Sequence, residues 1–432
     1  MTPGKLLTPF FIGLLFLAGS CSQSSSSNTS SADSGSTSSN VVIGVSSPPA
    51  GYASFSTLSG LQRGDELRLR LNREGTRIDE YPVYLDSIYN GGERLLLLTT
   101  EAELVVGAGD SGSPVLDAQG RVVASLCYGW ADNKHFFAAR AIEDLLALQG
   151  LPSARNAGRL AGLGLQKLGL VGPSVELRST RNWLQARGGA WSFHLLDSFA
   201  SRGERRSLRD SSLVLQPTLQ PGNTIAVLDL DGDLTSLGAY GTLSYQSGSE
   251  WYAFGHSYTL SGGQLSKPVV PAEMVTMIDT SPVARKLPKR SAGSFGAMTA
   301  DYFEGIRINP SATAPTIEAI ARITLDNQTD TFTHQVSLDV DASWQRGLLA
   351  YALSVPADYL LGGIIRRGSG SGVLTWTYDN ASSDNTTVSV SSTDLTSQLF
   401  SSLESDLQPL TDNTSRYWSL SRLELDLSLQ LD

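Results

Sequence analysis

Short β-strand patterns separated by turn residues constrain the fold of this chain more than any other feature. Runs rich in aliphatic, aromatic and β-branched residues alternate with Gly, Asp and Asn through the stretch from Val41 to Gln149. The strands expected there are Tyr52 to Leu58, Glu66 to Leu71, Glu80 to Tyr89 and Arg94 to Thr99. A hairpin at Val115 to Val123 and a short helix at Ala141 to Gln149 follow. Residues 41–150 are therefore expected to form a compact β-barrel of about six strands closed by that helix.

The remainder of the chain divides into a connector, a second β-rich lobe and a C-terminal region. Residues 151–216 are rich in Gly, Arg and Ser, which predicts a connector with some helix around Leu160 to Leu170. Residues 217–345 are expected to form the β-rich lobe, with strands at Thr224 to Leu230, Ala239 to Tyr245 and Trp251 to Phe254. Residues 346–432 are expected to form an α+β accessory region, with strands at Leu374 to Tyr378, Thr386 to Val390 and Leu423 to Leu431 and a helix at Ser401 to Leu410.

The first residues have the features of a targeting segment. Lys5 precedes a short apolar run that ends in Leu17-Ala18-Gly19-Ser20-Cys21, which resembles the lipobox of bacterial lipoproteins. The resemblance implies that residues 1–20 are a signal peptide and that Cys21 is lipidated and anchored in the cell envelope, with Ser22 favouring the outer membrane, facing the periplasm or the surface. Residues 21–40 are nearly all small and polar, which predicts a flexible tether. The alternative is an ordinary cleaved secretory signal.

Charge and residue counts argue against several classes of function. The formal net charge of -10 argues against nucleic acid as a partner, because such binding needs a basic face that displaces counterions. The four histidines are scattered and there is no H-E-x-x-H motif, so neither a metal site nor any other cofactor is expected. Acylation of Cys21 leaves Cys127 without a cysteine partner, which predicts a reduced and mostly buried thiol.

The most distinctive local motif is Gly109-Asp110-Ser111-Gly112-Ser113-Pro114. It lies between an apolar strand and the Val115 hairpin, in a turn that would present the Ser111 hydroxyl outward. The amides of Gly109 and Ser111 are candidates for an oxyanion hole, which would stabilise the negative charge that develops when Ser111 attacks a carbonyl. Ser111 is therefore the candidate nucleophile. The alternative is a tight Gly/Ser turn in a serine-rich chain.

A nucleophilic serine needs a positioned base. None of the four histidines precedes Ser111, which excludes the His-Asp-Ser order of chymotrypsin-like enzymes. His256 is the candidate base, because it follows a glycine at the end of a predicted hairpin strand rather than inside a core. His135 is the second candidate. His194 and His334 lie in the connector and in an alternating strand, where packing or exposure is expected.

Two sets of motifs carry a resemblance to a known family. Gly241-Thr242-Leu243-Ser244-Tyr245 forms a hairpin with the strand that leads to Gly255-His256, and the Gly109 to Pro114 turn is followed by Gly120-Arg121-Val122-Val123-Ala124. These motifs resemble those of the SpoIVB-type serine peptidases, named after stage IV sporulation protein B. The similarity covers about Asp65 to Leu146 and Pro221 to His256. It implies a mainly β protein with trypsin-like β-barrel lobes, a few short helices and a C-terminal accessory β-sheet domain. Because the serine motif precedes the histidine motif, a single site would require a permuted or a two-lobed arrangement.

The resemblance also implies an activity. Ser111 would be the nucleophile, His256 the base and Glu101 the acid, acting in a membrane-tethered serine endopeptidase on envelope or secreted proteins by acyl transfer. The partners would be a protein or peptide substrate and the membrane that holds the lipid anchor. A Ser-His dyad and an inactive site remain open. In the second case the chain would be a peptidase-fold lipoprotein that serves as a peptide-binding or structural module of the envelope.

Overall fold

The computed structural model describes residues 55–90, 93–101, 104–129, 135–150, 219–258, 266–278, 284–290, 293–338, 342–363, 366–413 and 419–432. The expected signal peptide, Cys21, the tether, and the connector with its helix and His194 lie outside these residues. Of the strand expected at Tyr52 to Leu58, the described part contains an isolated bridge between Phe55 and Val122.

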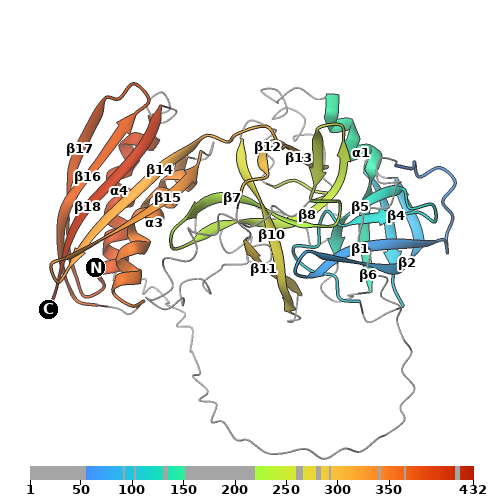
Figure 1. Cartoon of the computed structure of the whole chain (residues 1–432), viewed down its shortest axis with the longest axis horizontal. Coiled ribbons are helices and arrows are strands. Elements are labelled where there is room, and N and C mark those ends of the chain that lie inside the picture. The colour runs from blue at the N-terminus through green and yellow to red at the C-terminus, as the bar shows by residue number, and fades with distance from the viewer. Residues whose placement is uncertain are drawn as a thin grey trace, which may run out of the picture. The chain divides into compact units, whose positions relative to one another are not determined.

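The first lobe is a closed barrel of six strands, coloured blue to green in Figure 1. In their order around the barrel the strands are β1 (Glu66–Glu74), β2 (Arg77–Asn90), β3 (Arg94–Thr99), β6 (Phe136–Ala141), β5 (Val122–Gly129) and β4 (Pro114–Leu116). Alternate residues of β1 point inward, as the period of two in a strand requires, and Leu67, Leu69 and Leu71 are buried in an aliphatic core. The barrel expected from the strand pattern is confirmed.

A short helix follows this barrel, as expected. α1 (Ile142–Leu146) continues directly into the 3-10 turn η1 (Ala147–Gly150). Ile142 and Leu145 are buried in a cluster that also contains Tyr252 of the second lobe. The helix therefore contributes apolar surface to the junction between the two lobes as well as to its own barrel.

The second lobe is also a closed barrel of six strands. In their order around the barrel the strands are β7 (Thr224–Gly232), β8 (Ser236–Ser247), β9 (Glu250–Ala253), β13 (Gly305–Asn309), β12 (Gly296–Tyr302) and β10 (Lys267–Ile278). Pairing of β10 with β7, in which Val269 lies opposite Val227, closes the barrel. Its core is apolar and separate from that of the first lobe. The histidine motif lies at the end of β9.

A hairpin extends from the second barrel to the first. Residues 267–271 of β10 belong to the barrel, whereas residues 272–278 pair with β11 (Arg285–Arg290). Two backbone hydrogen bonds of 2.8 Å join Met274 to Gly75, between β1 and β2. We call residues 272–278 and 284–290 the arm. The arm also reaches the segment that carries the serine motif, through Ala284 and Lys286.

The C-terminal region is a five-stranded sheet covered by two helices (Figure 1, orange to red). The sheet contains β15 (Gln328–Ser337), β14 (Thr316–Leu325), β18 (Leu420–Leu431), β16 (Gly368–Tyr378) and β17 (Ser383–Ser392), and the helices α3 (Ala342–Leu360) and α4 (Leu395–Thr411) share its core. β14 and β15, expected in the second lobe, thus belong to the C-terminal core, which begins at Thr316 rather than near residue 346. β15 also pairs with β7, so this sheet is continuous with the second barrel.

Helix α3 is an element that the sequence pattern does not predict. A helix that is apolar on most sides lacks the 3.6-residue alternation that identifies an amphipathic helix, and α3 is buried along most of its length. It also contains Pro356, a residue that usually ends helices. The helix expected at Ser401 to Leu410 lies within α4, in which Leu399, Leu403 and Leu407 form a buried stripe four residues apart.

Candidate active site

The serine turn, residues 107–113, lies at the start of β4 and is fixed to the neighbouring strand of its own barrel. Gly112 N donates to the Leu126 carbonyl at 2.7 Å, and Leu126 N donates to the Ser113 carbonyl at 2.8 Å. Gly109 and Gly112 have φ angles of 92° and 95°, which favour glycine. Ser111 stands between them and is half-buried. The sequence order Gly-Asp-Ser-Gly therefore produces a tight turn at the surface of the barrel.

The amides of Gly109 and Ser111 are oriented by hydrogen bonds to the carbonyls that precede them. The Ala108 carbonyl accepts from Lys286 N and the Asp110 carbonyl accepts from Ser113 N, both at 2.9 Å. A trans peptide places its N–H opposite its C=O, so the two amide hydrogens point away from these partners. Within the described residues, neither amide donates to an acceptor. Both N–H groups are therefore without an acceptor of their own in the described residues, which leaves their role in an oxyanion hole a prediction.

Asp110 anchors the serine turn from within. Its carboxylate is fully buried and receives two hydrogen bonds from Arg73 Nη1, at 2.8 and 3.0 Å, and one from Gly107 N at 3.0 Å. Lys286 Nζ lies 3.3 Å from the same carboxylate. The motif alone does not reveal these two cations, because Arg73 and Lys286 come from β1 and from the arm. A buried charge requires such partners.

Lys286 is a fully buried lysine beneath the serine turn. Besides Asp110, its ammonium donates to Thr224 Oγ1 and to Thr242 Oγ1, each at 3.1 Å. Three acceptors in the described residues thus surround an ammonium that has three N–H donors. Burial lowers the pKa of Lys286 to about 8, against the opposing effect of Asp110.

The histidine loop, residues 254–258, follows β9 in an unusual backbone conformation. Phe254 has a φ of 72° although it is a bulky residue, and Gly255 follows with a φ of 64°. A left-handed conformation at a residue such as Phe254 costs about 1–3 kcal/mol and is concentrated at functional sites. The strained pair turns the chain sharply and leads directly into His256.

His256 is held in one tautomer by its neighbour. Its Nδ1 lies 2.8 Å from the Ser257 carbonyl oxygen. A carbonyl only accepts, so Nδ1 carries the hydrogen and Nε2 is left with the lone pair that a base requires. Two residues further on, Tyr258 N donates to the buried carboxylate of Asp301 at 2.6 Å, and the Tyr258 hydroxyl donates to Asp229 at 2.6 Å. These bonds fix the far end of the histidine loop.

The serine turn and the histidine loop meet at the junction between the barrels. Thr242 N donates to the Ser111 carbonyl at 2.8 Å. A Cβ at Gly112 would lie 1.9 Å from the Thr242 carbonyl oxygen and 2.6 Å from Phe254 N, so only glycine allows this approach. From the other side, Arg140 Nε donates to the Gly255 carbonyl at 2.9 Å. The two motifs are separated widely in sequence and adjacent in the fold.

The structure brings the backbones of the two motifs together, but the Ser111 hydroxyl and the His256 imidazole are not hydrogen-bonded to each other. Within the described residues, the Ser111 hydroxyl forms no hydrogen bond. Glu101, the expected acid, is exposed just after β3, and in the described part of the chain it forms no hydrogen bond or ion pair. Two acids contact the histidine loop in the structure, Asp301 and Asp229, both through Tyr258, and the sequence pattern reveals neither contact.

The other candidate residues lie apart from this junction. His135 is exposed before β6, and His334 is buried in β15, away from both motifs. Cys127 is free and buried, as predicted, and burial raises the pKa of its thiol to about 12, so it remains protonated and unreactive at neutral pH. Among the described residues, no group of three or more His, Cys, Asp and Glu side chains is suited to a metal ion.

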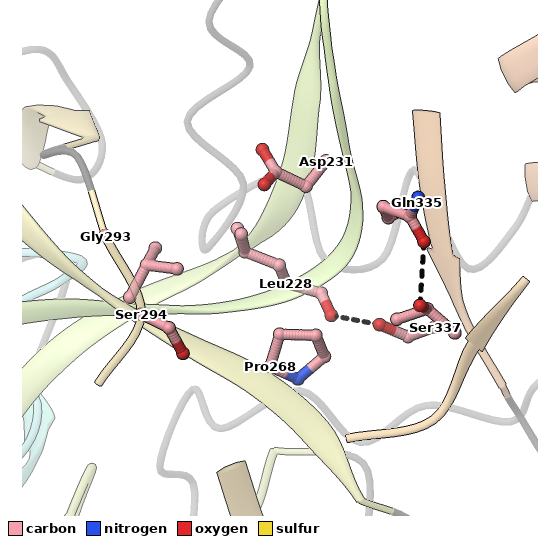
Figure 2. Close-up of a pocket in the computed structure, with 9 residues that line it drawn as sticks. Leu228, Asp231, Pro268, Gly293, Ser294, Gln335 and Ser337 are labelled. Atoms are coloured by element: carbon pink, nitrogen blue, oxygen red, sulfur yellow. Dashed lines mark hydrogen bonds between the residues drawn. The ribbon is translucent and has the colours of Figure 1, made fainter. Parts of the chain in front are cut away.

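A pocket of about 220 Å³ lies elsewhere, between β7, β10 and β15 (Figure 2). Ser337 donates to the Leu228 carbonyl at its wall, and Gln335 accepts a hydrogen bond from Thr316. Its lining contains no residue of the serine turn or the histidine loop. In the part of the chain that is described, no helix is long and apolar enough to cross a bilayer.

Two closed six-stranded barrels, with a serine turn and a histidine loop in contact at their junction, define a mainly β protein with lobes of the trypsin-like kind. The serine lobe precedes the histidine lobe in the chain. In comparisons with known proteins, no family model, no curated protein and no solved structure matches this chain. The resemblance to the SpoIVB-type peptidases therefore rests on the motifs alone.

Proposed function

We propose that this protein is a serine endopeptidase of the SpoIVB type, with Ser111 as nucleophile and His256 as base. The observation that carries the proposal is the contact between the two motifs: the Ser111 carbonyl accepts from Thr242 N, and Gly112 packs against the backbone of Phe254. The two amides without acceptors, Gly109 and Ser111, add the second requirement of an acyl-transfer site.

The proposed mechanism uses groups whose orientation the local contacts favour. His256 Nε2 removes the Ser111 proton, and the Ser111 oxygen attacks the peptide carbonyl. The amides of Gly109 and Ser111 donate to the oxyanion, and the imidazolium returns its proton to the leaving amine. Water then hydrolyses the acyl-enzyme with His256 again as base. The Ser257 carbonyl, which accepts from Nδ1, takes the orienting place of an acid, so a Ser-His dyad is the arrangement proposed.

The alternative is a catalytically inactive module that keeps the two lobes for peptide binding or for structure in the envelope. The observation in its favour is the Ser111 hydroxyl, which forms no hydrogen bond to His256 in the described structure. Resting sites are often looser than reacting ones, so this feature does not by itself decide between the two functions.

Labelling with a fluorophosphonate probe tests the activity, because such a probe reacts with an activated serine. Ser111→Ala and His256→Ala are each expected to reduce labelling by about a thousandfold or more, and the double variant is expected to be no worse than either. His135→Ala, which changes an exposed histidine of the serine lobe, is the control and should label like the wild type. A wild-type protein that does not label would support the inactive module.

We also propose that the enzyme is tethered to the envelope, most simply to the outer membrane, through lipidated Cys21. The support is the lipobox-like sequence before Cys21 and the polar tether after it. In a bacterial host, Cys21→Ser is expected to abolish incorporation of labelled palmitate and to move the protein from the membrane fraction to the soluble fraction. Undiminished palmitate labelling of that variant would contradict the lipid anchor without affecting the proposed active site.

A further inference from the structure

A buried lysine outside the histidine and serine motifs contacts the first half of the serine turn. The aliphatic stem of Lys286 lies beneath Gly109, where an added Cβ would be 3.1 Å from the lysine Cβ. Lys286 belongs to β11 of the arm, and the neighbouring Ala284 carbonyl accepts from Ala108 N at 2.8 Å. The arm therefore adds a short parallel pairing to the segment that enters the serine turn.

The backbone of Lys286 determines the direction of the first oxyanion donor. Lys286 N donates to the Ala108 carbonyl. Since the peptide between Ala108 and Gly109 is planar and trans, fixing that carbonyl also fixes the Gly109 N–H on the opposite side. Loss of the arm from this position would free the peptide to rotate and would remove one of the two donors.

The side chain of Lys286 acts on the next peptide through Thr242. The ammonium donates to Thr242 Oγ1, and the same hydroxyl lies 3.1 Å from the Gly109 carbonyl oxygen. A hydroxyl has one hydrogen, and the ammonium has no acceptor, so Thr242 must donate to the Gly109 carbonyl. Two successive hydrogen bonds, from Lys286 to Thr242 and from Thr242 to the Gly109 carbonyl, therefore hold the peptide between Gly109 and Asp110.

The third donor of the ammonium supports the residue before the nucleophile. Lys286 and Arg73 lie on the Asp110 carboxylate, which in turn accepts from Gly107 N. The carboxylate thus links the two ends of the segment from Gly107 to Asp110, and the two cations balance its charge. Three successive residues of the turn, Ala108, Gly109 and Asp110, are each bonded directly or through Thr242 to one lysine.

We propose that Lys286 is a positioning residue for the nucleophile, which holds the Gly109 amide in the orientation that stabilises an oxyanion and fixes the segment before Ser111, partly through Thr242. The catalytic part of this inference rests on the proposed function. Lys286 itself touches neither substrate nor the reacting atoms. The arm thereby makes the second lobe a contributor to the oxyanion hole as well as the source of the base.

Three variants test the inference by two readouts. Lys286→Met removes the ammonium and keeps the apolar stem, Thr242→Val removes only the hydroxyl, and Lys286→Arg keeps a charge with several N–H donors. Lys286→Met and Thr242→Val are expected to slow fluorophosphonate labelling by about tenfold or more, with partial recovery in Lys286→Arg. Hydrogen–deuterium exchange of the peptide containing residues 104–116 should be faster in Lys286→Met and in Thr242→Val than in the wild type. Exchange of β16 to β18 should be unchanged.

The matched control is Thr411→Val in α4. Thr411 is a buried threonine whose hydroxyl also donates to a backbone carbonyl, that of Leu407. It should leave both labelling and exchange of the serine turn unchanged. If Lys286→Met and Thr242→Val behave like Thr411→Val, the inference is overturned while the proposed activity stands. If the wild type never labels, the proposed function fails, and the exchange of residues 104–116 still decides whether Lys286 holds the turn.

Discussion

His334 is a histidine that the fold has buried without a hydrogen bond. Its ring is fully buried in β15, opposite Gly232 of β7, and both ring nitrogens are without a hydrogen-bond partner among the described residues. A Cβ at Gly232 would lie 2.2 Å from the imidazole, so the ring fills the space that a side chain would take there. Burial lowers the pKa of His334 to about 4, opposed by Asp233.

This pKa predicts a loss of stability in mild acid. Between about pH 6.5 and 4 the unfolded chain binds a proton at residue 334 that the native chain does not, so the free energy of unfolding falls as the pH falls through that window. The full effect is about 3 kcal/mol, from about 1.4 kcal/mol for each pH unit of difference. We expect urea unfolding at about pH 7 and about pH 4.5 to show a smaller difference for His334→Leu than for the wild type.

The exposed His135 provides the matched control. His135→Leu should retain the pH dependence of the wild type, because an exposed histidine loses little solvation on folding. Equal loss of stability for wild type and His334→Leu over the same window would assign the acid sensitivity to other groups.

At the scale of single residues, the sequence predicts the residues whose role depends on the conformation of their own backbone segment. Ser111 and His256 each lie in a glycine turn, and their glycines indicate where a side chain can be presented. Lys286 and Arg73 were not predicted, because nothing in their own segments identifies Asp110 as their partner. Arg140, which holds the Gly255 carbonyl, carried a weak signal as a single cation in an otherwise apolar strand.

At the scale of elements, the histidine loop depends on a glycine in a left-handed conformation against the first barrel. A Cβ at Gly255 would lie 2.7 Å from the Leu126 carbonyl oxygen and 2.8 Å from Ser125 Oγ. Gly255→Ala is therefore expected to push the loop away from the serine lobe. We expect it to destabilise the protein by about 2 kcal/mol or more and to slow fluorophosphonate labelling, since the base moves with the loop.

Gly248, in the turn between β8 and β9, separates the cost of a left-handed alanine from the effect of the contact with the first barrel. Its φ of 60° is close to that of Gly255, but an added Cβ there meets no atom within 4 Å. Gly248→Ala should cost about 1 kcal/mol in thermal or urea unfolding and leave labelling unchanged. If the two alanine variants are destabilised equally and both label normally, the contact of Gly255 with the first barrel has no role in placing His256.

The strands were predictable because most of them alternate or are bounded by turn residues. The expected strand Arg94 to Thr99 corresponds to β3 without change, and Leu423 to Leu431 lies within β18. The arm was not expected, since a segment such as Arg285–Arg290 has neither apolar alternation nor a turn signal of its own. Its conformation comes from pairing with β10 and with the segment before Ser111, which is tertiary information.

At the scale of the whole molecule, the order of the lobes is the main departure from a familiar peptidase. No histidine precedes Ser111 in the sequence, and the fold brings the later lobe, which carries His256, back to the earlier one. Contacts at the junction run in both directions: Thr242 and Lys286 hold the serine turn, and Arg140 holds the histidine loop. Each lobe therefore holds in place the motif that the other lobe carries.

β7 has three strand neighbours, β8, β10 and β15. Thr224 at its first residue contacts Lys286, while Leu230 and Gly232 near its end pair with β15. A fragment that ended after β13 would contain both barrels and every residue of the proposed site, yet it would leave backbone donors and acceptors of β7 without their partners and expose a new strand edge. The sheet at the C-terminus supplies the hydrogen-bond partners for the end of β7, so the shortest self-sufficient form of this protein is expected to extend past the two barrels.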